Sequence, residues 1–123
     1  MPKLTEGPHH GGFLVWEVLR DYTRETVTLA SGAGNLAPGT VLGKITTGGK
    51  YTRLAPTASN GSQTAAGILW GAVDATDADT PGVALIRGPA IVNRHEIVWP
   101  EGATEAQITT ATTALAALGI ILR

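Results

Sequence analysis

Glycine and proline interrupt this chain at short intervals, which limits most of it to short strands. The sequence holds 16 glycines and 7 prolines among its 123 residues. Several of them gather in turn clusters, such as residues 31–35, Pro38-Gly39 and Gly48-Gly49. Such clusters end secondary-structure elements, and glycine also permits the positive φ angles of tight turns. We therefore predict a compact, mainly β (α+β) domain built from short strands.

The segments between these turns have the patterns of individual strands. Residues 24–30 alternate polar and apolar side chains, as is typical of a half-buried strand. Residues 40–46 and 50–54 flank Gly48-Gly49, and this arrangement predicts a hairpin. The glycines within the apolar run 65–73 favour a buried strand over a helix. Further strands are predicted at residues 13–18, 83–87, 90–93 and 120–123, and an acidic loop at residues 74–82.

One helix is predicted, near the C-terminus. Thr104 is a good N-cap, and Gln107 three residues later completes a capping box. Gly119 suits the left-handed residue that follows a helix. We expect a helix over residues 104–118 that packs on its own β domain rather than on a neighbouring subunit. The apolar face of this helix consists of Ile108, Ala111, Leu115 and Leu118.

The first twelve residues cannot build a core. They contain two prolines, three glycines and the pair His9-His10, with Leu4 as the one large apolar residue after Met1. No apolar segment follows Lys3, so they do not form a secretory signal, and the chain has no run of about 18 apolar residues to span a membrane. The length fits one domain. We predict a flexible N-terminal arm over residues 1–12 and a single β-rich domain over residues 13–123.

Charge and composition exclude several classes of function. The formal net charge is -1, charged residues make up 15% of the chain, and there is no cysteine. Scattered lysines and arginines do not favour nucleic-acid binding, which relies on clustered cations. The absence of cysteine excludes disulfides, thiol catalysis and zinc–thiolate sites. A surface with so few charged residues is more typical of a subunit that is covered by neighbouring subunits than of an isolated monomer.

The candidate sites for phosphate or metal binding are incomplete. Residues 39–46 resemble a phosphate-binding loop, but only three residues separate the glycines, and Ile45 instead of Ser or Thr follows Lys44. No helix is expected after them to face a phosphate. A calcium site would need the spacing and the terminal glutamate of an EF-hand, which the acidic loop lacks. Its carboxylates are those of Asp74, Asp77 and Asp79.

Catalytic residues are not evident either. His9-His10 and His95-Glu96 do not supply the three or four ligands of a zinc site. Gly61-Ser62 lies in a loop without an evident base, and no Gly-x-Ser-x-Gly motif is present. We therefore expect no enzyme activity, no cofactor or metal, and no small-molecule substrate.

The three tryptophans are the largest aromatic side chains. Trp16, Trp70 and Trp99 are each predicted to be a core residue or an anchor of a subunit interface, with the core favoured.

Four stretches of the sequence, in order along nearly the whole chain, resemble the lambda-type head decoration proteins of tailed bacteriophages. The most distinctive stretch consists of residues 61–69 followed by residues 72–76. The other three are residues 4–7 with Phe13-Leu14, residues 39–54, and residues 97–101 leading into the helix.

This resemblance implies a β-clip-like fold and a structural role without catalysis or cofactor. It implies a homotrimer at the threefold and quasi-threefold sites of the expanded icosahedral head, on its outer surface. There the trimer clamps major capsid protein subunits and resists the pressure of packaged DNA. The protein is then made in the cytoplasm of the host bacterium and ends in the virion.

The resemblance also implies that the N-terminal arm is mobile in the free protein and becomes ordered on the capsid. Ordering eleven residues costs on the order of 10–20 kcal/mol of backbone entropy, so another protein has to compensate for it. We expect the arm to add as a strand to a capsid edge. Its expected contact residues are Leu4, Thr5, Glu6, Gly7, Phe13 and Leu14, with Leu4 and Phe13 as apolar anchors.

Two other functions fit the same composition. One is a small trimeric β-clip enzyme of the nucleotide-hydrolase type, similar to the dUTPases, although no acid-rich metal-phosphate site is evident. The other is a generic binding module of another phage structure, such as the tail, or of the cell envelope.

Overall fold

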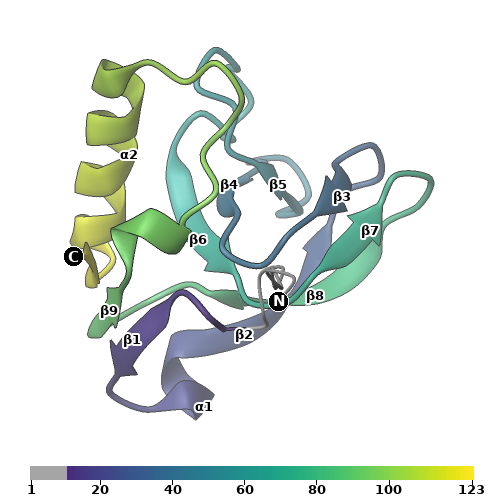
Figure 1. Cartoon of the computed structure of the whole chain (residues 1–123). Helices are drawn as coiled ribbons and strands as arrows, with labels where there is room; N and C mark the ends of the chain where they lie inside the picture. Colours follow the sequence, from purple (N-terminus) through teal and green to yellow (C-terminus); the bar gives the residue numbers. More distant parts are fainter. Residues whose placement is uncertain (1–10) are drawn as a thin grey trace, which may run out of the picture.

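The computed structural model describes residues 11–123 as ten strands with a helix near the C-terminus (Figure 1). The expected contact residues Leu4, Thr5, Glu6 and Gly7 lie outside the described residues. In chain order the elements are β1 (Leu14–Glu17), α1 (Arg20–Thr23), β2 (Arg24–Leu29), β3 (Gly34–Leu36), β4 (Val41–Lys44), β5 (Tyr51–Arg53), β6 (Ala65–Leu69), β7 (Val73–Ala75), β8 (Thr80–Leu85), β9 (Ala90–Val92), the 3-10 helix η1 (Arg94–Glu96), α2 (Glu105–Ala117) and β10 (Ile120–Leu122).

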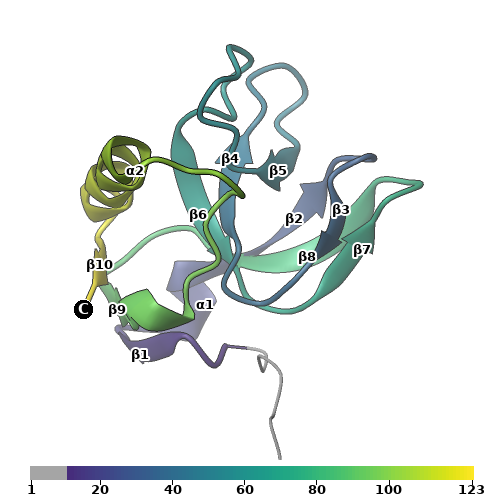
Figure 2. The same ribbon diagram turned by 45° about the horizontal axis from the view of Figure 1, so that its top comes forward.

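A closed barrel of β2, β5, β4, β6 and β8 forms the centre of the domain (Figure 2). Strands β2 and β8 pair antiparallel along their whole length, from Arg24 opposite Leu85 to Leu29 opposite Thr80. Strand β5 closes the barrel through one parallel partner pair, Leu29 with Tyr51. Because only Leu29 of β2 pairs with β5, residues 24–28 have no partner among the described strands on that side of the barrel.

Two smaller sheets extend the barrel at different places. Strand β9 lies between β1, which runs antiparallel to it, and β10, which runs parallel to it. This sheet therefore joins the beginning of the domain to its end. Strands β3 and β7 pair antiparallel as a separate ribbon, and Figures 1 and 2 place it on the side of the barrel away from α2.

The predicted hairpin and helix are confirmed. Strands β4 and β5 pair antiparallel, and Gly48 and Gly49 have φ angles of 88° and 71° in the turn between them. At the start of α2, the Gln107 backbone N–H donates to the Thr104 hydroxyl (3.1 Å), and the Thr104 N–H donates to the Gln107 side chain (2.9 Å). The helix buries Ala111 and Leu115 against its own domain, where it contacts β6 and β10.

The predicted loop over residues 74–82 is wrong, because both of its ends belong to strands. Val73 and Ala75 face inward in β7 while Asp74 between them is exposed, so the acidic side chain leaves the alternation of a strand intact. Strand β8 then begins at Thr80 and includes Pro81. The short helix α1 was not predicted either, and the apolar run 65–73 divides at Leu69, where β6 ends.

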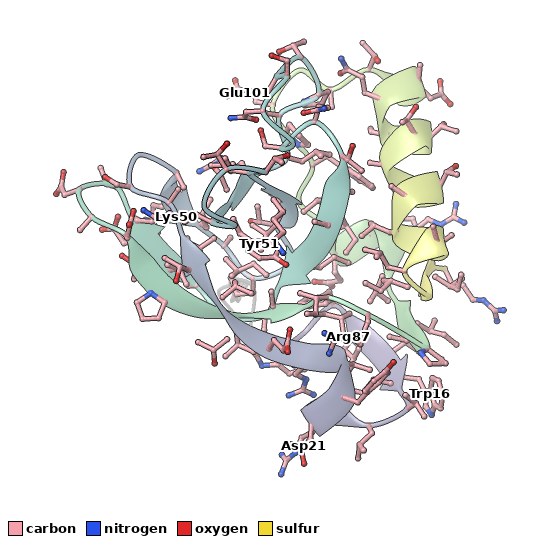
Figure 3. The ribbon with its side chains drawn as sticks, turned by 180° about the vertical axis from the view of Figure 1, so that it is seen from behind. Trp16, Asp21, Lys50, Tyr51, Arg87 and Glu101 are labelled. Carbon is pink, nitrogen blue, oxygen red and sulfur yellow. The ribbon has the colours of Figure 1, made fainter. Side chains whose placement is uncertain are left out.

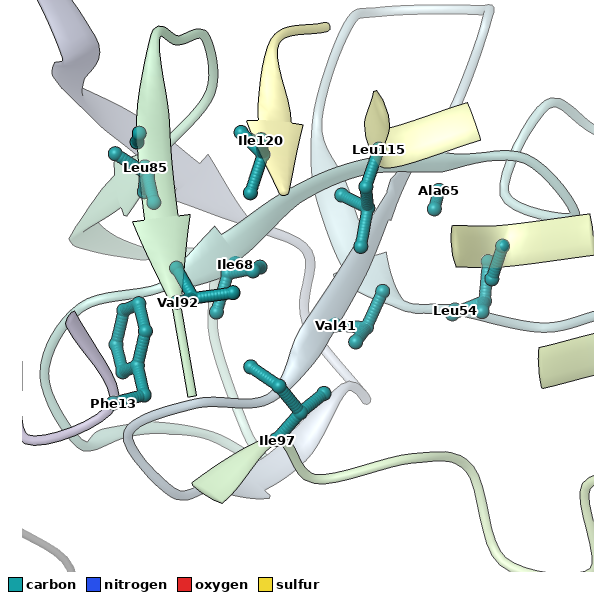
Figure 4. Close-up of a cluster of buried hydrophobic side chains, with 12 residues drawn as sticks. Phe13, Val41, Leu54, Ala65, Ile68, Leu85, Val92, Ile97, Leu115 and Ile120 are labelled. Carbon is teal, nitrogen blue, oxygen red and sulfur yellow. The ribbon is translucent and has the colours of Figure 1, made fainter. Parts of the chain in front are cut away.

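Two clusters of buried side chains make up the core. The larger one fills the space between the barrel, α2 and the β1-β9-β10 sheet (Figure 4); it includes Phe13, Ile68, Leu85, Val92, Leu115 and Ile120. The smaller one joins the barrel to the β3-β7 ribbon and includes Leu29, Leu36, Leu42, Leu69 and Ala84. Close backbone packing accompanies them: a Cβ on Gly43 would lie 2.3 Å from the Ser62 carbonyl oxygen. The mainly β class with one long C-terminal helix is thus confirmed, whereas the β-clip assignment stays a prediction.

Candidate functional site

The segment that resembles a phosphate loop is a buried strand. Val41, Leu42 and Gly43 are buried in β4, and the chain continues into the hairpin turn rather than into a helix. Lys44 is exposed, and its ammonium nitrogen lies 5.8 Å from the centroid of the Tyr51 ring. The segment therefore contributes to the barrel. It does not lead into a helix whose N-terminal N–H groups could bind a phosphate.

Two of the acidic carboxylates, those of Asp74 and Asp79, have different hydrogen-bond partners. The Thr76 hydroxyl and backbone N–H donate to Asp74 (2.6 and 3.1 Å), and they lower the pKa of its carboxyl. Lys50, which pairs with Asp79, and the backbone N–H of Ser31 (2.8 Å) lower the pKa of Asp79. Among residues 11–123, no group of three or more His, Cys, Asp or Glu side chains could hold a metal ion.

The pH dependence of stability should report these bonds. A carboxyl whose pKa is lowered by folding stabilises the fold above its unfolded value of 3.8, and this contribution is lost as the pH falls through the lower folded value. We expect Asp79→Asn to flatten the dependence of the melting temperature on pH below about 4. Melting curves from pH 2 to pH 6 measure this, with Asp77→Asn as the control for one lost charge in the same segment. A wild-type pH dependence in Asp79→Asn would contradict the assignment.

The remaining polar candidates have structural surroundings. His95 and Glu96 are exposed in η1, which Asn93 caps by accepting the His95 backbone N–H (3.0 Å). Ser62 is buried, and its hydroxyl donates to the Asn60 side chain (2.6 Å), so it helps to shape the loop. His9 and His10 lie outside the described residues.

The tryptophans occupy three different environments. Trp70 and Trp99 are half-buried and pack against the larger core cluster, and their role as core residues or interface anchors stays a prediction. Trp16 is 49% exposed on β1, so the favoured core placement does not hold for it, and its role as an anchor of a subunit interface stays a prediction. The register of β1 shifts between Leu14 and Trp16, and this irregularity turns both Val15 and Trp16 outward.

Trp16 belongs to an exposed apolar surface that runs from β1 into α1. We call it the β1–α1 surface; it consists of Val15, Trp16, Val18, Leu19 and Tyr22, which are 49–61% exposed. Across the sheet, Trp16 pairs with Ile91, and Ile91 pairs with the exposed Ile121. Contiguous apolar surfaces of this kind mark protein–protein contacts more often than isolated exposed residues do.

Two arginines beside this surface are paired within the chain, while Arg20 and Asp21 lie exposed among its residues in α1. Arg87 donates to Glu25 (3.1 Å), and its guanidinium carbon lies 5.2 Å from the centroid of the Tyr22 ring. Figure 3 shows Arg87 at the same end of the domain as Trp16 and Asp21. Arg24 forms an ion pair with Glu17. A partner at the β1–α1 surface would thus meet its apolar side chains together with one exposed cation and one exposed anion, which suits another protein surface better than a polyanion.

Phe13 is part of the core, which corrects its predicted role as an apolar anchor of the arm. Its side chain is 2% exposed, and its ring meets Trp70 edge to face with centroids 5.7 Å apart. Burial makes Phe13 unavailable to another protein unless the core opens. Leu14 is half-buried and packs on the same cluster. The sequence missed the β1–α1 surface, although the apolar residues from Val15 to Tyr22 carry its signal.

Comparison with known proteins assigns the chain to a family. In the part of the chain that the structure describes, no helix is long and apolar enough to cross a membrane. None of the curated proteins compared with the chain matches it. The family model for bacteriophage lambda head decoration protein D matches residues 3–120, and the resemblance inferred from the sequence is thereby confirmed. The chain belongs to the family of bacteriophage lambda head decoration protein D.

Proposed function

We propose that the protein acts as a homotrimer that clamps the outer surface of an expanded phage head at its threefold and quasi-threefold sites. The family consists of structural proteins that decorate the capsid, so the chain is a capsid decoration protein of the virion surface and not an enzyme. The match over residues 3–120 carries the proposal. The proposal adds three features to this family role: the trimer, its binding sites on the capsid and its resistance to the pressure of packaged DNA.

The β1–α1 surface is the part of the described domain best suited to contacts between subunits. Permanent homo-oligomer interfaces are more apolar than transient ones, and their cores are depleted of charge. The exposed side chains of the surface are aliphatic or aromatic, while Arg87 is already engaged with Glu25 and Tyr22. In a cyclic trimer each subunit presents two different faces, and we assign the β1–α1 surface to one of them.

Trp16→Ser should weaken the trimer. A half-exposed tryptophan in the middle of an apolar surface is the type of residue whose truncation costs about 2 kcal/mol or more of binding free energy. Sedimentation equilibrium over a range of protein concentrations measures the effect. The matched control is Val98→Ser, because Val98 is an exposed apolar residue outside the β1–α1 surface. A Trp16→Ser protein that stays as trimeric as the control would contradict this assignment.

We further propose that residues 1–12 bind the capsid, with Leu4, Thr5, Glu6 and Gly7 as contact residues. Phe13 is left out of this set because it fills the core. Addition of the segment as a strand would satisfy its backbone groups and use Leu4 as an apolar anchor. Three such segments per trimer make the second and third contacts intramolecular, which raises the overall affinity without new chemistry.

Cosedimentation with purified phage particles tests the proposed seat. The full-length protein is mixed with expanded empty heads, with unexpanded proheads and with isolated tails. We expect saturable binding to expanded heads and much weaker binding to the other two. Binding to tails with none to heads would instead favour a module of another phage structure.

A further inference from the structure

The first described residue, Gly11, lies directly on the indole of Trp70. Its backbone N–H donates to the Trp70 carbonyl oxygen (2.9 Å), and its φ angle is 65°. A Cβ at this position would lie 2.1 Å from Cζ2 and 2.4 Å from Cη2 of Trp70. Only glycine therefore fits, both for its backbone conformation and for the approach of the ring.

Several side chains hold the Trp70 ring in place. The guanidinium carbon of Arg24 lies 3.4 Å from the ring centroid, within the range of a cation–π contact. Glu17 pairs with Arg24 and also accepts the hydroxyl of the buried Thr23. The side chains of Glu17 and Arg24 are only 10% and 21% exposed, so the pair is largely shielded from water. We call Gly11, Glu17, Arg24 and Trp70 the Trp70 cluster.

Gly11 contacts the rest of this cluster through its backbone alone. Phe13 fills the larger core cluster just before β1, with Trp70 packed against it, whereas Gly11 adds no side chain. What the hydrogen bond and the close fit do is fix the backbone of Gly11 to the end of β6, which lies next to Trp70 in the chain. The contact thus determines where the preceding residues leave the domain.

We propose that the Trp70 cluster positions the N-terminal segment for capsid binding, with Trp70 and Arg24 as positioning residues that need not touch the capsid. The inference rests on the proposed role of residues 1–12. A segment that starts from a fixed point has fewer residues to order on binding and a higher effective concentration at its target. Releasing Gly11 removes this fixed point in all three subunits of a trimer at once.

Gly11→Ala is the direct test, and Gly102→Ala is its matched control. Both glycines have positive φ angles, of 65° and 74°, but a Cβ on Gly102 meets nothing within 4 Å. The control therefore reproduces the backbone strain without displacing a ring. We expect Gly11→Ala to bind expanded heads about tenfold or more weakly than Gly102→Ala, with the same trimer and melting temperature. Equal binding by the two variants would overturn the proposal.

Two further results separate this inference from its alternatives. If Gly11→Ala dissociates the trimer or melts well below Gly102→Ala, the cluster belongs to the fold and the proposal is wrong. If deletion of residues 1–10 leaves head binding unchanged, the proposed role of the segment fails instead. If the deletion abolishes binding and Gly11→Ala does not weaken it, only the present inference fails.

Hydrogen exchange on the unmodified trimer gives a measurement that needs no variant. The Gly11 amide is bonded to the Trp70 carbonyl oxygen, so it should exchange more slowly than a solvent-exposed amide. We expect protection of this amide in the free trimer. Exchange at the rate of an unstructured peptide would overturn the proposal.

Discussion

Phe13→Ala is expected to lower the free energy of unfolding by about 3–5 kcal/mol, the usual cost of truncating a buried phenylalanine. The ring is 2% exposed and lies in the larger core cluster, with the Trp70 ring at its edge. Removal of the ring leaves a cavity in this cluster, which adds to the cost of the lost apolar contacts. Since small domains are stable by only about 5–15 kcal/mol, much of the total stability would be lost.

Urea unfolding followed by circular dichroism measures this cost. Val98→Ala is the matched control, because Val98 is 36% exposed and lies outside the β1–α1 surface. The control should stay within about 0.5 kcal/mol of the wild-type protein. A Phe13→Ala protein of wild-type stability that fails to bind heads would restore Phe13 to the capsid-binding segment and contradict the core assignment.

Deletion of residues 1–10 is expected to leave the stability of the domain unchanged and to weaken binding to expanded heads. The described core contains no residue before Phe13, and Gly11 keeps its hydrogen bond to Trp70 after the deletion. The melting temperature and the trimer should therefore remain. Binding to expanded heads should fall by about 100-fold or more, because three intramolecularly linked contacts are lost together.

The control for the deletion is a chain that keeps residues 1–10 in scrambled order. It has the same length, charge and composition but no longer presents Leu4 beside Thr5 and Glu6. Cosedimentation with expanded heads compares the three proteins. Wild-type affinity in the deleted chain would show that the folded domain alone binds the capsid.

Elements with local signals could be predicted from the sequence. The β4–β5 hairpin follows from Gly48-Gly49, whose positive φ angles the turn requires. Helix α2 follows from its capping box, since both hydrogen bonds join residues three apart. Both elements could be predicted because the residues that determine them lie within the element itself.

Features that depend on distant partners could not be predicted in the same way. Asp74 pairs with Asn35, and Pro81 with Thr28, so their strands exist because of segments far along the chain. Closure of the barrel depends on one parallel pair between β2 and β5. Acidic composition and a proline then suggested a loop where long-range pairing makes strands.

The β1–α1 surface could not be predicted from the sequence because it also depends on strand pairing. A strict alternation in β1 would have placed Val15 and Trp16 on opposite faces of the sheet, but the shifted register exposes both. The apolar run from Phe13 onward therefore supplies one core residue and then an outer surface. The apolar run predicted the strand, while only the pairing with β9 showed which side chains it buries.

The copy number of the protein in purified heads distinguishes a decoration of the whole capsid surface from a component present at a few sites. Heads from an infection with the phage that encodes the chain are purified, and the protein is quantified against the major capsid protein by mass spectrometry with isotope-labelled standards. A trimer at every threefold and quasi-threefold site predicts roughly equal copy numbers of the two proteins. Absence of the protein from purified heads, or a few copies per particle, would contradict its role as a decoration of the whole capsid surface.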